Sequence, residues 1–213
     1  MLNTRLKKYQ FIISNLGIWV PAKFFLKKIL YLDYFYFLTA PLKKVEPGIR
    51  ILSDIQIAEA RNEDWAMIVD GLKLLDSNER REVIVRLLFY QKGFYSCYIG
   101  RNESGDIVSL QWLIRPNDNH LIERHFNDFF YPLNEKQVIV ENIFVYPKYR
   151  GLGVFTTVNH LLLEKAREEG FRRCHAYIQK GNIASLNGFM KLGFQVKKLL
   201  RSYNVCGFSW RNL

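Results

Sequence analysis

The feature that most constrains this chain is the segment from Val140 to Val154. In it, an apolar run passes through Pro147 into an Arg-Gly-Leu-Gly turn at residues 150–153, and a stretch with helical spacing follows. Glycines let a backbone come close to a ligand, and the unpaired N–H groups at a helix start attract phosphate oxygens. Arg150 can add a charge-assisted hydrogen bond. The segment therefore predicts a buried strand, a tight turn and a helix whose N-terminus can bind an anion.

The turn does not match the two best-known phosphate-binding motifs. No Gly-Lys-Ser/Thr follows it, as a Walker loop requires, and Thr156 stands where a dinucleotide fingerprint needs a third glycine. Taken alone, the turn leaves two interpretations open: a pyrophosphate site, or a helix start with a structural pair of glycines.

The remaining pattern predicts a mixed sheet. Residues 102–106 join two strands as an antiparallel hairpin, and the later alternation of strands and helices requires at least one parallel crossover. We therefore expect an α/β (α+β) fold with a mixed, mostly antiparallel central sheet flanked by helices. The expected strands are 49–52, 94–99, 107–114, 137–145, 173–179 and 194–205, and the expected helices include 76–93, 151–169 and 182–192.

The basic charge is concentrated near the N-terminus. The 213 residues contain 31 Lys and Arg and 20 Asp and Glu, a net charge of +11. Residues 1–50 hold nine basic and two acidic residues, so only +4 remains for the other 163. A nucleic-acid partner is not expected, because no element with base-contacting residues is recognisable.

Residues 1–46 are predicted to form a helical arm outside the main domain, which we place at 47–213. Within residues 1–44, basic clusters alternate with aromatic and aliphatic runs. Such a segment can pack on its own protein or on a second copy, and it also has the composition of a peripheral element on an anionic membrane. Its longest uncharged run, from Tyr9 to Ala22, is too short to span a bilayer and lacks a convincing signal-peptide cleavage site.

Cysteine and histidine usage indicates a reducing compartment and no metal. The three cysteines are widely spaced, so we expect neither a disulfide framework nor a zinc ribbon, and a cytoplasmic location fits best, with membrane attachment as the alternative. His120, Glu123 and His125 do not have the spacing of a helical zinc motif. The cysteines are Cys97, Cys174 and Cys206.

A second motif lies 32 residues after Arg150, where Asn182-Ile-Ala-Ser185 is followed by Phe189-Met-Lys-Leu-Gly-Phe194. Together the two motifs resemble the GNAT superfamily of acyl-CoA-dependent N-acetyltransferases, whose pattern is V-x-P-x-x-R-G-x-G-x-G/A, a helix, a strand, an Asn and Y-x-K-x-G-F. The resemblance is strong over 138–196, plausible over 49–137 and absent from the N-terminal arm. The matching residues are Val145, Pro147, Arg150, Gly151, Gly153, Asn182, Lys191, Gly193 and Phe194.

The resemblance implies acetyl-CoA or another acyl-CoA as co-substrate, without a metal. The strand before the turn would splay from its parallel neighbour, and a backbone N–H would polarise the thioester carbonyl between them. The pyrophosphate would lie on the turn amides, the pantetheine arm along the preceding strand, and two further side chains beside that arm. The turn amides are those of Arg150, Gly151, Leu152, Gly153, Val154 and Phe155. The strand residues beside the pantetheine arm are Ile143, Phe144 and Val145, and the two further side chains are Asn182 and Ser185.

Two residues depart from the family pattern. Phe155 occupies the last Gly/Ala position of the turn motif, so phosphate binding could be looser or the turn displaced. Phe189 stands where many relatives have a tyrosine that protonates the departing thiolate. That role is either vacant or falls to Tyr203, Tyr177 or water.

Glu141 is the expected general base. It precedes Val145 by four residues on the strand that should run under the thioester, where relatives often carry a glutamate. A partly desolvated carboxylate with a raised pKa can take a proton from an amine. The alternative is a surface carboxylate paired with Arg or Lys.

The insert at 115–136 is expected to form a lid or wall over the acceptor, with Phe126, Phe129, Phe130 and Tyr131 in it. The expected acceptor contacts are Trp112, Arg115 and Glu123. The resemblance thus implies transfer of an acetyl group to the primary amine of a small metabolite such as an amino sugar. The alternative is a catalytically degenerate acyl-CoA-binding module that the basic arm tethers to a membrane or partner.

Overall fold

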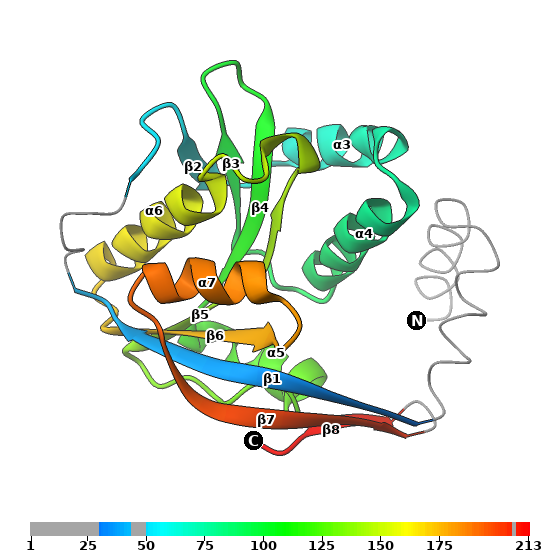
Figure 1. Ribbon diagram of the computed structural model, residues 1–213, viewed down its shortest axis with the longest axis vertical. Helices are drawn as coiled ribbons and strands as arrows, with labels where there is room; N and C mark the ends of the chain where they lie inside the picture. The colour runs from blue at the N-terminus through cyan, green and yellow to red at the C-terminus, as the bar shows by residue number, and fades with distance from the viewer. Residues whose placement is uncertain (1–29, 44–49, 206–207) are drawn as a thin grey trace.

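The computed structural model describes residues 30–43, 50–205 and 208–213, which form one mixed sheet flanked by helices (Figure 1). The strands are β1 (Leu30–Pro41), β2 (Gln56–Glu59), β3 (Cys97–Arg101), β4 (Ile107–Ile114), β5 (Gln137–Val145), β6 (Arg173–Gln179), β7 (Gln195–Val205) and β8 (Phe208–Arg211). The helices are α3 (Asn62–Gly71), α4 (Ser77–Gln91), α5 (Asn119–Phe126), α6 (Val154–Glu168) and α7 (Ile183–Lys191), and short 3-10 turns are η1 (Leu72–Leu74), η2 (Pro116–Asp118) and η3 (Pro147–Tyr149).

The sheet has the order β2-β3-β4-β5-β6-β1-β7-β8, and β5 with β6 is its parallel pair. The other neighbours are antiparallel, which confirms the expected mixed sheet. β5 and β6 pair over three positions, from Gln137 opposite Arg173 to Ile139 opposite His175. Beyond Ile139 the ladder stops although both strands continue, so they splay apart at the end where the turn begins.

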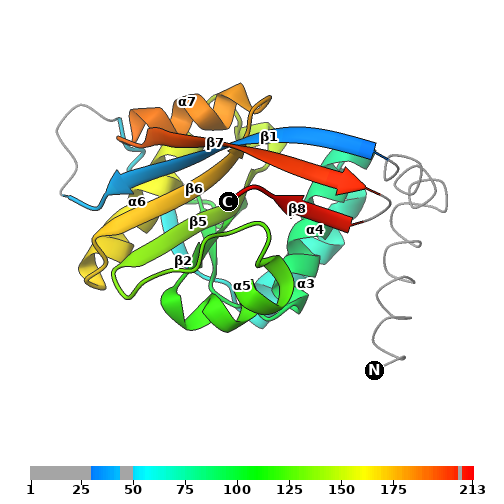
Figure 2. The same ribbon diagram turned by 90° about the horizontal axis from the view of Figure 1, so that it is seen from below.

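Helices lie on both faces of the sheet (Figures 1 and 2), and two large buried clusters with a smaller third one hold the layers together. Side chains of α6 and α7 pack on one face, where Leu162 and Phe189 contact residues such as Val138. Side chains of α3, α4 and α5 pack on the other, where Ile84 and Ile122 join Trp112 and Ile139 among others. Alternate residues of each central strand supply the two clusters, as the two-residue period of a strand requires.

Residues 30–41 correct the expectation of a helical arm over 1–46, because β1 lies inside the sheet between β6 and β7. Its apolar residues alternate between the faces: Phe35 and Phe37 pack with one cluster, and Tyr36 and Leu38 with the other. Aromatic and branched residues suit a pleated surface that is buried on both sides. Residues 1–29 and the expected boundary at Pro47-Gly48 lie outside the described residues, so the remainder of the arm stays a prediction.

Other elements differ in detail from the expectation. Residues 50–52 have no regular structure, and the first strand after this segment is β2. β8 was not expected, and the predicted helix at 151–169 begins only at Val154. α4 confirms its predicted start, since the Asp76 side chain accepts hydrogen bonds from the N–H groups of Asn78 and Glu79.

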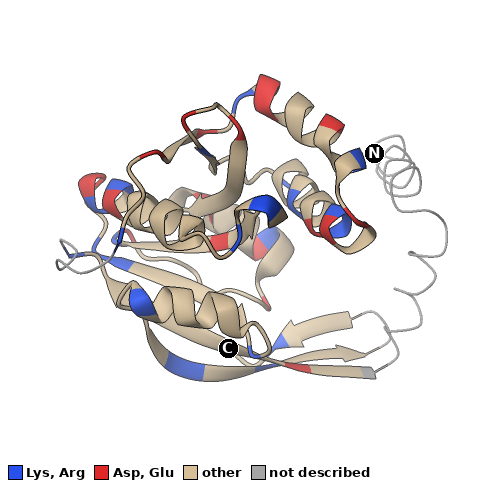
Figure 3. Cartoon of the chain, turned by 45° about the horizontal axis from the view of Figure 1, so that its top comes forward, with Lys and Arg blue, Asp and Glu red and all other residues tan. Residues whose placement is uncertain are grey.

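Charge is spread over the described chain, with basic and acidic segments scattered over helices and strands in Figure 3. Among the helices of this part, none combines the length and apolar character needed to cross a bilayer. Within the same residues, no three His, Cys, Asp or Glu side chains gather closely enough to share a metal ion. His120 instead has its Nδ1 atom 2.8 Å from the carbonyl oxygen of Asn117.

Candidate cofactor and acceptor site

A bulge in β5 bends the strand where it leaves β6. Glu141 pairs with Trp112 and Phe144 with Leu110, so two residues of β5 face one of β4. Asn142 supplies the irregularity with a φ of 55°, a left-handed conformation that asparagine tolerates better than most residues. The bulge breaks the alternation of side chains just where the parallel pairing ends.

Arg86 from α4 fixes this bulge. Its Nε donates to the carbonyl oxygen of Asn142 at 2.9 Å, and its Nη2 donates to that of Ile143 at 2.8 Å. Its Nη1 reaches the Glu82 carboxylate at 2.9 Å, and only 11% of the Arg86 side chain is exposed. Desolvation lowers the pKa of Arg86 and the Glu82 partner opposes that effect. A buried cation thus binds two consecutive carbonyls of the irregular strand.

The turn after β5 has the predicted form. Gly151 and Gly153 adopt φ values of 76° and 89°, which a residue with a Cβ would adopt only with strain. Gly153 is the N-cap of α6, so the first-turn N–H groups of this helix have no intrahelical partner. These groups and the positive helix end make the turn a candidate anion site.

Arg150 is held by protein groups rather than left free for an anion. Its Nη1 lies 2.8 Å from Oε1 of Glu79, and its Nε donates to the carbonyl oxygen of Val145 at 3.0 Å. The guanidinium also stands over the Phe144 ring. Arg150 therefore ties the turn to α4 and to the end of β5.

Phe155 and Phe189, the two departures from the family pattern, pack against each other at the α6–α7 contact. Their ring centroids are 5.4 Å apart in an edge-to-face arrangement. The Phe155 ring also covers Gly188, where a Cβ would fall 2.6 Å from Cδ1 of Phe155. The bulky residue of the turn motif is thus accommodated by a glycine in the opposite helix.

Asn182 and Ser185 lie together at the start of α7. The Asn182 side-chain oxygen accepts a hydrogen bond from the Ser185 N–H at 3.1 Å, which caps the helix. This arrangement brings both residues to the opening between the splayed strands, as the resemblance implies.

Three adjoining hollows run along the splay. We call them the cofactor groove, the neck and the acceptor cavity, with volumes of about 560, 170 and 320 Å³. Their linings overlap: groove and neck share Arg86, Ile143, Asn182 and Ser185, while neck and acceptor cavity share Glu141 and Asn142. The groove is further lined by Phe144, Val145, Arg150, Gly151, Gly153 and Phe155, whereas Leu152 and Val154 are absent from this lining. The three hollows therefore follow one another from the turn to Glu141 and beyond it, and we call this row of neighbouring hollows the passage.

Glu141 has the environment expected of a general base. Its Oε2 atom is buried and has no hydrogen-bond partner. Burial raises the pKa of this carboxyl from its usual 4.5 to about 7, while Arg211, the backbone of Asn142 and Arg86 oppose the shift. The carboxyl is therefore close to half ionised at neutral pH, where it can both accept and return a proton.

Tyr177, and not Tyr203, is the tyrosine of the neck. Its hydroxyl accepts a hydrogen bond from the Tyr131 N–H at 2.9 Å, which leaves its own proton free to be donated. Burial raises its pKa well above the usual value, so the hydroxyl stays protonated. Tyr203 stacks on Trp210 between β7 and β8 and lines none of the three hollows, which corrects its assignment as a catalytic residue.

The acceptor cavity is walled by the insert, as expected. Phe126, Phe129 and Phe130 line it together with Phe89 of α4 and other apolar residues. Their rings also pack on one another in the core cluster of this face. Four of the ten lining residues are therefore aromatic, two are aliphatic and four are polar or charged.

The three expected acceptor contacts are all elsewhere. Trp112 is 0% exposed, and its Nε1 donates to the carbonyl oxygen of Phe94 at 2.8 Å, so it is a core residue. Glu123 is exposed on α5 and does not line the cavity. Both were chosen from residue type alone, which does not indicate the direction of a side chain.

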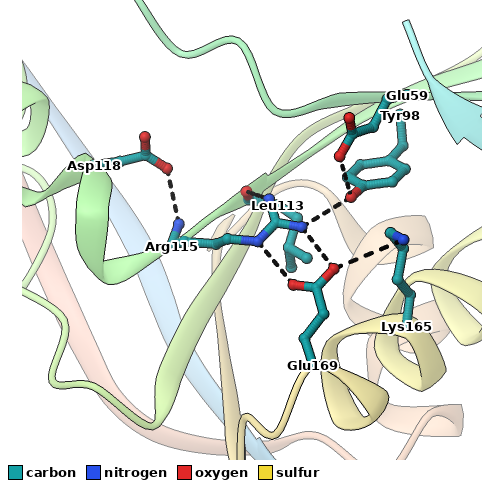
Figure 4. Close-up of polar contacts among 7 residues, drawn as sticks. All are labelled: Glu59, Tyr98, Leu113, Arg115, Asp118, Lys165 and Glu169. Carbon is teal, nitrogen blue, oxygen red and sulfur yellow. Dashed lines mark hydrogen bonds and ion pairs between the residues drawn. The ribbon is translucent and has the colours of Figure 1, made fainter.

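Arg115 belongs to a structural network instead (Figure 4). Its Nε and Nη2 donate to the two carboxylate oxygens of Glu169, each at 2.9 Å, and Nη2 also donates to the Tyr98 hydroxyl at 2.8 Å. That hydroxyl donates to Glu59 at 2.8 Å. The paired guanidinium lowers the pKa of Glu169. The network ties β4 to the end of α6, away from the passage.

Sequence reasoning missed the cations of the site. Arg86 is one of three arginines on α4, and no sequence pattern separates it from Arg80 and Arg81. Arg211 lines the acceptor cavity only because β8 folds back on β7. These residues are recognisable from their burial and partners, which the tertiary structure alone provides.

Comparisons with known proteins agree with this geometry. The sequence model of the Acetyltransferase (GNAT) family matches residues 75–194. No curated protein matches the sequence.

Several solved structures share the fold at low identity. The GCN5-related glucosamine N-acetyltransferase region of a fungal multi-domain GH3 beta-N-acetylglucosaminidase has a TM-score of 0.57 at 11% identity, over 85% of this chain and 22% of that one. A GCN5-related N-acetyltransferase from Sphaerobacter thermophilus has a TM-score of 0.55 at 11% identity, over 88% of this chain and 57% of that one. A GNAT acetyltransferase from Colwellia psychrerythraea has a TM-score of 0.52 at 10% identity, over 94% of this chain and 72% of that one. The chain spans less than two thirds of the first two proteins.

The family match covers the strand, turn and helices that build the passage, and the fold agrees with it. The chain belongs to the GNAT acetyltransferase family.

Proposed function

We propose that this protein transfers an acetyl group from acetyl-CoA to the primary amine of a small molecule, by direct attack on the thioester. One observation carries the proposal: the neck lies between the cofactor groove and the acceptor cavity, and Glu141, whose Oε2 atom has no hydrogen-bond partner, lines both the neck and the acceptor cavity. A reaction between two bound substrates needs this connection. A module that only binds acyl-CoA does not.

Coenzyme A would lie in the groove with its pyrophosphate on the turn. The first-turn amides of α6 and the left-handed glycines of the turn suit a phosphate oxygen. A further hollow beyond the turn, of about 750 Å³, is lined by Arg50 and Lys191. Two cations there favour a negatively charged nucleotide portion. Asn182 and Ser185 would border the pantetheine arm.

The thioester carbonyl would be polarised by the backbone of the bulge. Arg86 binds the carbonyl oxygens of Asn142 and Ile143, and these belong to the peptide units whose N–H groups come from Ile143 and Phe144. Hydrogen bonds in a chain polarise one another, so a cation on a peptide oxygen makes its N–H a stronger donor. Arg86 thus acts as a positioning residue behind the donor that faces the developing oxyanion.

Proton transfer would be shared by Glu141 and Tyr177. Glu141 takes a proton from the amine, directly or through water, as the amine nitrogen forms its bond to the carbonyl carbon. The bond from that carbon to sulfur then breaks, and the thiolate takes a proton from Tyr177 or from water. The products are the N-acetylated amine and free coenzyme A, so atoms and charge balance.

The acceptor cavity favours a small amine with an apolar body. Its volume of about 320 Å³ is near the lower end for ligand pockets. An amino sugar, which the sequence led us to expect, needs hydrogen-bond partners for several hydroxyls, whereas six of the ten lining residues are apolar. Attachment to a membrane or to a second copy was expected of residues 1–44; because residues 30–41 form β1 within the sheet, it stays a prediction for residues 1–29, as does the cytoplasmic location.

Thiol release from acetyl-CoA tests the proposal. We expect release that depends on both acetyl-CoA and an added primary amine, together with a mass gain of one acetyl group on the amine. Binding of coenzyme A without turnover of any amine, in a protein that acetyl-CoA stabilises against heat, would instead support the degenerate acyl-CoA-binding module.

A further inference from the structure

The lining of the acceptor cavity includes an acidic and a basic side chain, Glu141 and Arg211. Each has a buried polar atom without a hydrogen-bond partner: Oε2 of Glu141 and Nε of Arg211. The two groups also influence each other electrostatically. A buried polar atom without a hydrogen-bond partner is costly, so these two atoms favour a ligand that supplies the missing partners.

Arg211 is held in place by its surroundings. Its guanidinium lies 3.7 Å from the centre of the Phe35 ring and also stands over Phe129 and Tyr177. Its Nη1 donates to the carbonyl oxygen of Phe129 at 3.0 Å, and the backbone N–H of Arg211 donates to the carbonyl oxygen of Asp128. A planar guanidinium fixed in this way is well suited to a carboxylate, which it can bind through two parallel hydrogen bonds.

Apart from Lys92 and Asn142, the remaining wall is apolar. Val85, Leu88 and Phe89 of α4 face Phe126, Phe129 and Phe130 of the insert. A ligand that fills this cavity therefore needs a hydrocarbon or aromatic body, because polar groups placed against these rings would lose their hydration without compensation.

We infer that the acceptor is an α-amino acid with an apolar side chain, whose amine lies at Glu141, whose carboxylate pairs with Arg211 and whose side chain packs among the phenylalanines. The inference rests on the proposed function and narrows its substrate class. An amine and a carboxylate on one carbon match the two charges, and the side chain leaves that carbon in a third direction.

Lys92 is the alternative cation. It also lines the acceptor cavity, and its Nζ atom lies 4.2 Å from the centre of the Phe126 ring. Because lysine is a point charge on a flexible stem, it imposes less direction on a carboxylate than arginine does. Lys92 therefore serves as the matched control for Arg211.

The test compares L-phenylalanine with L-phenylalaninamide as acceptors in the thiol-release assay. The two molecules have nearly the same size, and the amide lacks only the negative charge. The amine of the amide is less basic than that of the amino acid, so a larger fraction of it is unprotonated at pH 8. Any intrinsic difference in reactivity therefore favours the amide. We expect kcat/KM for the amino acid to exceed that for the amide by roughly ten- to a hundredfold, as loss of a partner for a charged group usually costs. L-leucine and its amide should give the same order.

Variants assign this preference to a residue. In Arg211→Met the ratio of the two kcat/KM values should fall to within about threefold of one, and Arg211→Lys should keep part of it. Lys92→Met should keep the full ratio. Because Arg211 packs on three rings, its variants can lose stability, so the wild-type protein provides an independent readout. With coenzyme A present, L-phenylalanine should raise its Tm more than the amide does.

The outcomes separate the two proposals. Equal or better turnover of the amide, of 2-phenylethylamine or of D-glucosamine would overturn the amino-acid inference and leave the acetyltransferase proposal standing. Loss of the ratio in Lys92→Met, with retention in Arg211→Met, would overturn the assignment to Arg211. Absence of thiol release with every amine, from a protein that binds coenzyme A, would overturn both proposals.

Discussion

The ring of Phe155 lies on the bare Cα of Gly188, and this contact joins the first turn of α6 to the middle of α7. A Cβ at position 188 would come within 2.6 Å of Cδ1 of Phe155. The residue that departs from the family's turn motif is therefore matched by a glycine 33 positions later. Phe155 fills space between the helices and also lines the cofactor groove.

We expect the effect of Gly188→Ala on stability to depend on the residue at position 155, and to be of opposite sign next to phenylalanine and next to alanine. In the wild type it should destabilise by about 1–3 kcal/mol through overpacking. In a Phe155→Ala background the clash is gone, and the better helix propensity of alanine should instead stabilise by roughly 0.5–1 kcal/mol. Urea unfolding of the four proteins of this double-mutant cycle measures both effects. Equal effects in the two backgrounds would refute the contact.

Gly151 should matter for coenzyme A binding beyond its effect on folding. It has a φ of 76° and open space around its Cα, and Gly105 in the β3–β4 hairpin has a φ of 80° with equally open space. Gly151→Ala and Gly105→Ala should therefore lose similar stability, about 1 kcal/mol each, from backbone strain. Only Gly151→Ala should raise the Kd for coenzyme A, measured by calorimetry. Unchanged affinity in Gly151→Ala would remove the turn from the cofactor site.

Arg86→Lys should reduce kcat roughly tenfold or more, because a lysine cannot bind two carbonyls of the bulge and Glu82 together. The KM for acetyl-CoA should stay within about threefold, since Arg86 acts through the backbone donor. Arg81→Lys, on the exposed side of the same helix, is the control and should retain the wild-type kcat. A rise in KM at unchanged kcat would mean that Arg86 holds coenzyme A rather than the bulge.

Much of the site's backbone could be predicted from sequence because short-range physics determines it. The limits of β5 and β6 agree with prediction residue for residue, since runs rich in apolar residues and bounded by turn residues define them. The glycines at 151 and 153 indicated the turn, because a tight turn depends on local backbone conformation. The first strand could not be predicted in this way, because β1 pairs with β6 and β7, more than 130 residues distant in sequence.

The functional side chains were harder to predict than the backbone, because their contacts depend on the tertiary structure. Glu141 was identifiable because a strand position and a resemblance both pointed to it. Trp112 and Arg115 were misassigned because polar and aromatic residues near a site are as often structural, and only burial and the Glu169 pairing reveal that. Arg211 could not be found at all, since its place in the cavity depends on the β7–β8 pairing near the C-terminus.

Glu141→Gln should stabilise the protein at alkaline pH. The folded state raises the pKa of this carboxyl from 4.5 to about 7, so ionisation favours the unfolded chain, and the wild type loses stability as pH rises from about 4.5 to 7. The variant lacks this loss. We expect the two proteins to be similar at pH 4 and the variant to be more stable by roughly 2–4 kcal/mol at pH 8. Denaturant unfolding at both pH values measures the difference, and an equal gap at both would contradict the buried-acid account.

The pH dependence of kcat/KM for amine-dependent thiol release, compared between the wild type and Glu141→Gln, tests the central claim most directly. In the proposed mechanism the ionised carboxylate is the base, so the wild-type rate should rise with an inflection near pH 7 and level off above it, until other groups titrate. The variant should be slower by ~10²–10⁴-fold and lack that inflection. The same inflection and a similar rate in Glu141→Gln would contradict catalysis by Glu141 at the meeting point of the two cavities.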